Sequence, residues 1–190
     1  TENYETDSPD VKIVSDYLGV ASSLYTTDEG KVTWTFDVPK TGMYNLKITY
    51  SGSYEGRQGI IERTLYLDGK IPFDEATYIH LDRTFIDVYD QQRLKDIHGN
   101  DTRPKQQEVE LWMTQPVKDS AGYYAEPFQF YLTEGTHTIT LESVREFLLI
   151  SEFTFYNEQD IPTYAEKLKE YEAKGYQKAS GDIVYQQAEQ

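Results

Sequence analysis

The 190-residue sequence contains no cysteine and three histidines. The lack of cysteine excludes a disulfide framework, a thiolate nucleophile and cysteine-based metal sites. The histidines, His80, His98 and His137, lie far apart and form no His-x-x-x-His pair, so a zinc site is not expected. The chain also lacks a Gly-x-Ser-x-Gly nucleophile elbow, and its Gly-rich stretch GSYEGRQG lacks the Lys-Ser/Thr of a phosphate-binding loop. These absences favour a protein that is not an enzyme.

Positive charge and long apolar runs are also scarce. The chain has 18 Lys and Arg residues against 33 Asp and Glu, which gives a formal net charge of −15. Such a surface repels phosphate backbones, so nucleic acid is not an expected partner. No apolar run approaches the roughly 20 residues that span a bilayer, and no membrane insertion is expected. The chain begins at Thr1 without a signal peptide, so we expect a mature or excised fragment.

Aromatic residues are abundant, and many lie in segments that alternate with a period of two. Aromatic content is 14%, led by 17 tyrosines, whose apolar bodies and polar tips suit both cores and half-wet surfaces. The segments KVTWTFDV (31–38) and MYNLKITY (43–50) alternate cleanly around a turn at Pro39 and Gly42, which predicts an antiparallel hairpin. The inward residues expected are Val32, Trp34, Phe36, Val38, Tyr44, Leu46, Ile48 and Tyr50.

Further strands with turn signals between them predict an all-β sandwich over residues 11–157. They include LYLDGK with its Asp68-Gly69 turn, PFQFYL, LTEGTHTITL and FLLISEFTFY. Residues 1–10 are polar and acidic, which predicts a flexible arm. Residues 71–125 form a long insertion, which we interpret as short strands plus functional loops.

The period changes after Asn157. Tyr164, Leu168 and Tyr171 follow the i, i+4, i+7 spacing of an amphipathic helix over 161–175. Thr163 and Glu166 have the spacing of a capping box, and Gly175 has the place of a C′ stop. We interpret residues 158–190 as a helix plus a linker or tail that leads toward a missing domain.

Four segments together carry a family resemblance: VTWTFDVPKTGMYNLKITY, LYLDGK, LTEGTHTITL and ISEFTFY. In this order they resemble carbohydrate-binding modules with the galactose-binding-like jelly roll, over about residues 30–156. The chain also resembles accessory domains fused to extracellular solute-binding proteins or glycoside hydrolases of Gram-positive bacteria. The resemblance implies a non-catalytic jelly roll that binds polysaccharide or oligosaccharide, often holds a structural calcium, and is secreted or displayed on the cell surface.

A glycan site needs flat rings that stack on pyranose faces, and polar groups for the hydroxyls. The insertion and the Gly-rich loop supply both kinds of side chain. The indole of Trp112 and the ring of Tyr124 have an alternative role, which is to fill a secondary core under the insertion. Our candidate ligand-binding residues are Tyr50, Tyr54, Arg57, Asn100, Arg103, Trp112, Tyr123 and Tyr124.

A calcium site is a further candidate in HGNDTRP (98–104). Asp96, Asn100 and Asp101 offer oxygen donors at close spacing, although the EF-hand order and its final Glu are missing. A solvated turn is the alternative for this stretch. For the protein as a whole, the alternatives to a glycan-binding module are a structural interdomain β-sandwich without glycan binding, and a small hydrolase with two facing carboxylates.

Overall fold

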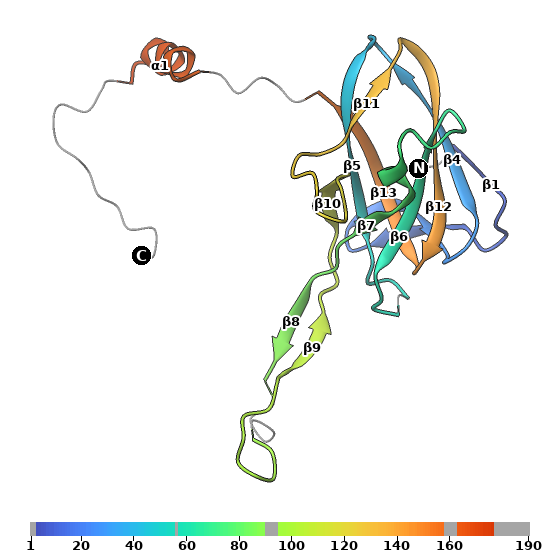
Figure 1. Ribbon diagram of the computed structural model, residues 1–190, viewed down its shortest axis with the longest axis vertical. Helices are drawn as coiled ribbons and strands as arrows, with labels where there is room; N and C mark the ends of the chain where they lie inside the picture. The colour runs from blue at the N-terminus through green and yellow to red at the C-terminus, as the bar shows by residue number, and fades with distance from the viewer. Residues whose placement is uncertain (1–2, 56, 90–94, 158–162, 177–190) are drawn as a thin grey trace. The chain divides into compact units, whose positions relative to one another are not determined.

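The computed structural model describes residues 3–55, 57–89, 95–157 and 163–176. It divides into two units, residues 1–157 and residues 158–190, and each is described by itself. The first unit is a sandwich of two antiparallel sheets (Figure 1), which confirms the predicted fold class. The first sheet has the order β1 (Tyr4–Thr6), β4 (Lys31–Val38), β12 (Gly135–Arg145), β6 (Ile61–Leu67) and β7 (Ile79–Leu81).

The second sheet packs on the first and contains the other half of the predicted hairpin. Its order is β10 (Met113–Pro116), β5 (Gly42–Ser51), β13 (Leu148–Tyr156), β3 (Val20–Thr26) and β2 (Lys12–Tyr17), with β11 (Gln129–Leu132) paired to β5. The segments 31–38 and 43–50 are both strands, but they lie in different sheets, so they do not pair as a hairpin. Each strand instead pairs with a distant segment, β4 with β12 and β5 with β13.

The core between the sheets comes from the alternating faces. The period-2 pattern places one side of each strand inward, and apolar burial there is the main stabilising force of the sandwich. Phe36 lies on the predicted inward face but is only partly buried, at the margin of the core. The buried core includes Leu24, Val32, Trp34, Leu46, Ile48, Tyr50, Leu65, Ile139 and Leu141.

The N-terminal segment differs from its expected form. Where the sequence predicts a flexible arm over 1–10, the structure has strand β1, which pairs with β4. The Asp7 carboxylate accepts a hydrogen bond from the backbone N–H of Lys31 at 2.6 Å, and Ser8 is buried. Asp7, one of the acidic residues that suggested a solvated arm, therefore holds the segment against the start of β4.

The long insertion holds short strands, as expected. After a 3-10 turn (Asp74–Thr77) and β7, the chain forms a two-stranded hairpin of β8 (Phe85–Val88) and β9 (Lys105–Glu108). Figure 1 shows this hairpin leaving the two sheets. We call residues 85–108 the arm, a segment distinct from the N-terminal residues 1–10. The chain then returns through β10 and β11 to the edge of β5.

The second unit contains the helix α1 (Tyr164–Ala173). Thr163 Oγ1 accepts a hydrogen bond from Glu166 N, and the Glu166 carboxylate accepts one from Thr163 N, which confirms the capping box. Gly175 follows the helix with a φ of +83°, as a C′ residue should. No helix of the described residues is long and apolar enough to cross a membrane. The predicted linker and tail at 158–162 and 177–190 lie outside the described residues.

Candidate functional site

Three aromatic side chains from distant segments meet at the end of the sandwich from which the arm leaves. The ring centroid of Tyr17, at the end of β2, lies 5.1 Å from that of Tyr54 in the β5–β6 loop and 6.0 Å from that of Trp112. All three side chains are half-buried. The Trp112 indole N–H donates to the Tyr17 carbonyl oxygen at 3.0 Å, and the Tyr17 hydroxyl lies 3.0 Å from Ser53 Oγ. Hydrogen bonds therefore hold the Tyr17 and Trp112 side chains in place, and packing holds the Tyr54 ring.

A second layer of rings supports this group. Tyr25 is buried, and its ring centroid lies 5.7 Å from that of Tyr54 and 5.9 Å from that of Phe147. Burial, with the nearby Glu55 carboxylate, raises the pKa of the Tyr25 phenol to about 12, so the phenol stays protonated at neutral pH. We call Tyr17, Tyr25, Tyr54, Trp112 and Phe147 the loop-end cluster.

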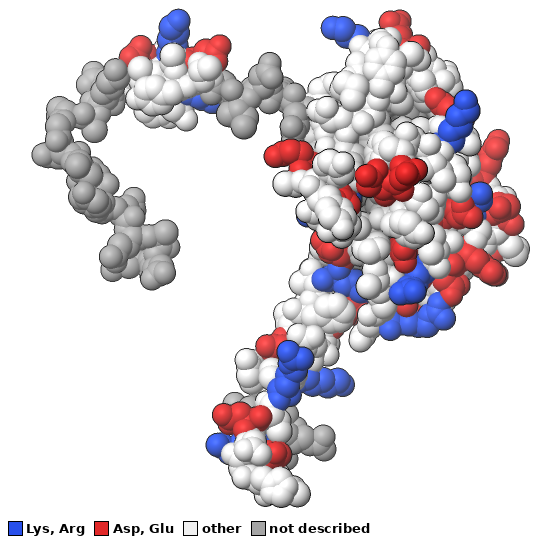
Figure 2. Space-filling view, viewed as in Figure 1, with Lys and Arg blue, Asp and Glu red and all other residues white. Residues whose placement is uncertain are grey.

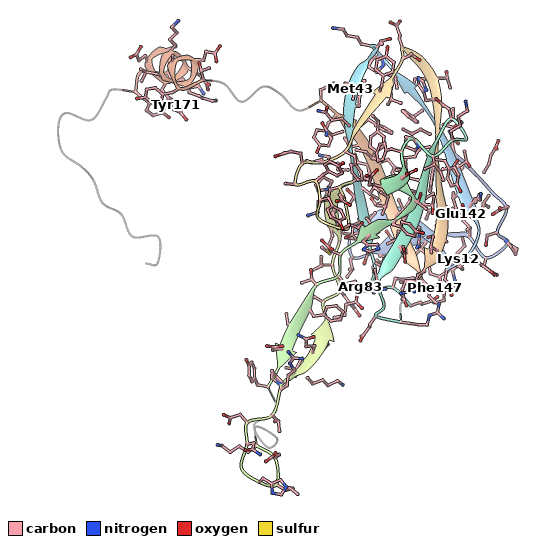
Figure 3. The ribbon with its side chains drawn as sticks, in the orientation of Figure 1. Lys12, Met43, Arg83, Glu142, Phe147 and Tyr171 are labelled. Carbon is pink, nitrogen blue, oxygen red and sulfur yellow. The ribbon has the colours of Figure 1, made fainter. Side chains whose placement is uncertain are left out.

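Charged side chains surround the loop-end cluster. The Arg57 guanidinium lies over the Phe147 ring at 5.0 Å and pairs with Asp28. The Lys12 ammonium lies over the Tyr25 ring at 4.8 Å. Figure 3 shows Lys12, Arg83 and Phe147 at this end of the sandwich, and Figure 2 shows Lys and Arg side chains gathered there. This end therefore carries cations on a chain whose net charge is −15.

A buried arginine fastens the β5–β6 loop to its neighbours. Arg83 donates from Nη1 to the Gly52 carbonyl oxygen at 2.6 Å, and from Nε to the Gly59 carbonyl oxygen at 2.8 Å. Its guanidinium also binds the Glu108 carboxylate at 2.6 Å and the Glu146 carboxylate at 3.0 Å. Because the two carbonyls lie at the two ends of the loop, Arg83 fixes the loop that carries Tyr54 and Arg57.

Strained backbone is concentrated around the same loops. Six described non-glycine residues have positive φ. Five of them lie at the β2–β3 turn, in the β5–β6 loop or at the β12–β13 turn, and the sixth is Asp68. The others are Asp16, Leu18, Glu55, Gln58 and Glu146. Left-handed backbone in such residues costs free energy and is enriched at ligand sites, where the surrounding structure enforces it. The concentration here therefore marks this end of the sandwich as a candidate site.

A cleft of about 340 Å³ lies beside the loop, a size within the usual range of ligand pockets. It runs between the end of the β5–β6 loop and the segment that leads into the arm. Its wall includes the side chains of Gln58, His80, Asp82, Arg83 and Phe85. Hydrogen-bonding groups and aromatic faces are thus both available at the loop end.

The structure brings together three of the predicted ligand residues: Tyr54, Arg57 and Trp112. The Trp112 ring packs on Tyr17, as the secondary-core alternative expects, while part of the residue stays exposed. Tyr50 was wrongly assigned to a binding loop. It is 0% exposed, and its hydroxyl lies 2.7 Å from Gln115 Oε1 and 2.8 Å from the Asp82 carbonyl oxygen. The alternation of β5, which places Tyr50 on the same face as Ile48, decides its burial.

Tyr123 and Tyr124 lie in a different loop, where both rings are exposed, at 87% and 59%. The buried Asp119 carboxylate organises this loop by accepting hydrogen bonds from the backbone N–H groups of Ala121, Tyr123 and Tyr124 at 2.6 to 3.1 Å. These bonds lower the pKa of Asp119. The pair therefore offers a second set of exposed rings, apart from the loop-end cluster.

Asn100 and Arg103 belong to the arm, away from the loop-end cluster. The donors proposed for calcium do not fit a metal there. Both Asp96 carboxylate oxygens accept hydrogen bonds, Oδ1 from the backbone N–H groups of His98 and Asn100, and Oδ2 from the Asn100 amide. Asp101 pairs with Lys95. No group of three acidic or histidine side chains suited to a metal occurs in the described residues. The stretch forms a self-bonded turn, the alternative given for it above.

Sequence reasoning missed Tyr17, Phe147 and Arg83. Tyr17 lies in a segment of weak strand character, and Phe147 lies in a run that reads as strand core. Arg83 is surrounded by carboxylates and carbonyls from segments 24 to 63 residues away. No local pattern reports such contacts. The one available signal was the excess of tyrosine near predicted strand ends.

A scan against protein-family models found no match, and a search of the curated proteins found none. Solved structures do match. One is a Paenibacillus sp. cycloisomaltooligosaccharide glucanotransferase complexed with cycloisomaltoheptaose, at 16% identity and a TM-score of 0.48, over 80% of this chain and 18% of that chain. Another is a family 35 carbohydrate-binding module from Clostridium thermocellum, at 10% identity and a TM-score of 0.43, over 83% of this chain and 100% of that chain. A third is a family 35 module from Cellvibrio japonicus, at 13% identity and a TM-score of 0.47, over 83% of this chain and 91% of that chain.

Two of these three structures are carbohydrate-binding modules, the class of protein that the four sequence segments resemble. This chain spans less than a fifth of the length of the glucanotransferase.

Proposed function

We propose that the sandwich binds polysaccharide or oligosaccharide at its loop end, without catalysis. The observation that supports this most directly is the loop-end cluster, in which hydrogen bonds fix the half-exposed rings of Tyr17 and Trp112, and the Tyr54 ring packs against Tyr17. A pyranose ring stacks its C–H face on such rings, and its hydroxyls find partners in the adjoining cleft. Rings that are already ordered lose little side-chain entropy on binding.

The biological setting follows as part of the same proposal. A module of this kind concentrates a fused catalytic or solute-binding domain on its glycan, outside the cell. One site of this size binds weakly, and avidity comes from several modules or a repeating polymer. Calcium is not part of the proposal, because the donors expected for it are bonded to the turn itself.

The second candidate function is a structural interdomain module, and the arm favours it. The outward residues of the arm include exposed apolar side chains, among them Phe85, Ile86, Val88 and Tyr89. Such a surface fits a neighbouring domain better than it fits water. The two candidates use different parts of the molecule, so variants separate them.

The test is calorimetry or affinity electrophoresis against a panel of gluco-, manno-, xylo- and galacto-oligosaccharides and their polymers. Tyr54→Ala is expected to weaken binding about 10-fold, because it removes one stacking ring. The Tyr123→Ala/Tyr124→Ala double variant is the matched control, since it removes two exposed rings elsewhere and is expected to bind as the parent does. Absence of binding to every glycan, or equal loss in both variants, contradicts the loop-end site.

A further inference from the structure

The base of the arm is joined to the sandwich by a buried ion pair between Arg83 and Glu108. The Arg83 side chain is 4% exposed and the Glu108 side chain is 9% exposed, so water hardly reaches the pair. Beside it, the backbone N–H of Val109 donates to the Thr84 carbonyl oxygen at 2.9 Å and closes the ribbon. Figure 3 labels Arg83 where the arm leaves the sandwich. We call the side chains of Arg83, Glu108 and Glu146 the base clamp.

The Arg83 guanidinium has a different partner on each side. Nη1 donates both to the Gly52 carbonyl oxygen and to Glu108 Oε1, each at 2.6 Å. Nε donates to the Gly59 carbonyl oxygen, and Nη2 donates to Glu146 Oε2 at 3.0 Å. Because the donors of a guanidinium form a rigid planar fork, the two carboxylates set the orientation in which the loop carbonyls are bonded. Loss of either carboxylate therefore lets the guanidinium turn away from the loop.

Glu146 gives the β5–β6 loop a second point of attachment. Its carboxylate is 6% exposed, and the Oε2 atom that binds Arg83 also accepts a hydrogen bond from the backbone N–H of Arg57 at 2.7 Å. The backbone of Glu146 has a φ of +70°, an unfavourable value for a residue with a long side chain. The turn between β12 and β13 is thus held in the shape that directs this carboxylate at the loop.

Two glycines let the loop approach the base clamp closely. A Cβ atom at Gly59 would lie 2.7 Å from Glu146 Oε1. A Cβ atom at Gly52 would lie 3.2 Å from Arg83 Nη1 and 2.5 Å from Ile61 Cδ1. Neither glycine has a positive φ, so the close approach, and not an unusual backbone conformation, explains the lack of a side chain. Both ends of the loop therefore fit against the base clamp.

We propose that Glu108, a residue of the arm, is a positioning residue for the loop-end site. Through Arg83 it holds the β5–β6 loop, and with it Tyr54, in the shape that binds a glycan. This inference rests on the function proposed above. A loop that is ordered before the ligand arrives loses less entropy on binding, so a loosened loop binds the same glycan more weakly. The arm thus supports glycan binding through its base, without any contact between its strands and the ligand.

The Arg57 amide reports directly on the base clamp, because its N–H is bonded to Glu146. In ¹H–¹⁵N spectra of the full chain without ligand, hydrogen exchange at this amide is expected to be about 10-fold faster in Glu108→Leu than in the parent. The reference is the Val117 amide, which donates to the Leu46 carbonyl oxygen at 2.8 Å inside the sandwich. It should accelerate much less, because the change loosens the loop and not the whole fold.

Glycan affinity is then measured by calorimetry with oligosaccharides that bind the parent, at a temperature where every variant is folded. Glu108→Leu is expected to weaken binding about 5-fold. Glu108→Gln keeps an acceptor oxygen for Arg83 and should restore most of this loss. Gln107→Leu, on the exposed neighbour in β9, is the matched control and should bind as the parent does. Gly59→Ala displaces Glu146 from the other side, and should weaken binding similarly if Glu108→Leu does not fold.

Equal glycan affinity in Glu108→Leu and the parent overturns the positioning role, while the loop-end site stands. Equal acceleration of the Arg57 and Val117 amides overturns it too, because Glu108 then stabilises the whole fold and not the loop. A parent that binds no glycan overturns the proposed function, and the positioning role with it, whatever the exchange rates are. The failure of the inference alone is thus recognised by a parent that binds and a variant that binds equally well.

Discussion

The sandwich and the arm are built from the same antiparallel ladder but are stabilised very differently. In the sandwich, β4 pairs with β12 along its whole length and buries Val32, Trp34 and Val38 beneath the other sheet. In the arm, β8 pairs with β9, yet every residue of β8 is exposed. A ladder without a buried face is marginal on its own, since net hydrogen-bond energy in water is small. The comparison indicates that the sandwich stabilises the domain and the arm provides surface.

The largest change in the free energy of unfolding should come from replacing the buried Arg63 in the sandwich. Its guanidinium donates to the carbonyl oxygens of Glu62, Arg145 and Glu146 at 2.8 to 2.9 Å. Burial lowers its pKa. Arg63→Met leaves buried carbonyls without donors, and we expect the free energy of unfolding to fall by about 3–5 kcal/mol. Chemical denaturation measures this. Arg145→Met, on an exposed neighbour, is the control and should change it by less than about 0.5 kcal/mol. If both variants change the free energy of unfolding equally, then the Arg63 guanidinium adds no stability and only the aliphatic part of its side chain does.

A smaller effect is expected at the turns of the sandwich, where His137 Nδ1 lies 2.7 Å from the Asp68 carboxylate. Asp68 and the Thr133 carbonyl raise the pKa of His137. Burial opposes a lower pKa at Asp68, but the N–H of Thr138 and the imidazole lower it overall.

Because the pKa of His137 is raised in the folded state, protonated His137 stabilises the fold fully below the pKa of the unfolded chain, near 6.5. This stabilisation is lost as pH rises through the pKa of His137 in the folded state. The Asp68 contribution is present above about pH 4 and is lost as pH falls through its lowered folded pKa. The pair should therefore stabilise the fold most between about pH 4 and 6.5. Because Asp68 is half-exposed, we expect at most about 0.5 kcal/mol more stability at pH 5.5 than at pH 8.5 from this pair. Thermal melts at both values measure it, and His137→Gln should remove the difference. A difference that persists in the variant must come from another group.

The smallest effect is expected from the arm. Replacing residues 86–107 by a short Gly-Ser turn, while keeping Phe85 and Glu108, should change the free energy of unfolding by less than about 0.5 kcal/mol. The reason is that the described side chains of the removed segment are mostly exposed, while the Arg83–Glu108 ion pair at the arm base remains. Denaturation curves test this. A loss comparable with that of Arg63→Met would mean that the arm is part of the core. Unchanged glycan binding in this variant would also separate the loop-end site from the structural role of the arm.

Much of the scaffold could be predicted, because its signals are local. Alternation in 31–38 and 43–50 identified inward residues such as Val32, Trp34 and Ile48. The Asp68-Gly69 turn was visible as a dipeptide, and both residues have the positive φ that a type I′ turn requires. The capping box at Thr163 is likewise an interaction over three residues. Strand pairing was not visible, since β4 and β5 are consecutive in the chain but belong to different sheets.

The candidate sites were predictable only in part. Tyr54, Arg57 and Trp112 were chosen for residue type and loop placement, and they do meet at one end. Tyr50 was chosen for the same reasons and is buried, because it still belongs to the alternation of β5. Trp34 was assigned to the core, and it does pack there.

What the sequence by itself determined is the β-sandwich class, the main strands, the Asp68-Gly69 turn and the capped helix. Each of these depends on contacts within a few residues, or on which face of a strand is apolar. What only the tertiary structure decided is the assembly of Tyr17, Tyr54 and Trp112, and the burial of Arg83 among distant carbonyls. The physical reason is that these depend on how two twisted sheets and their loops pack together, and the side-chain pattern of one strand carries no record of the strand that faces it.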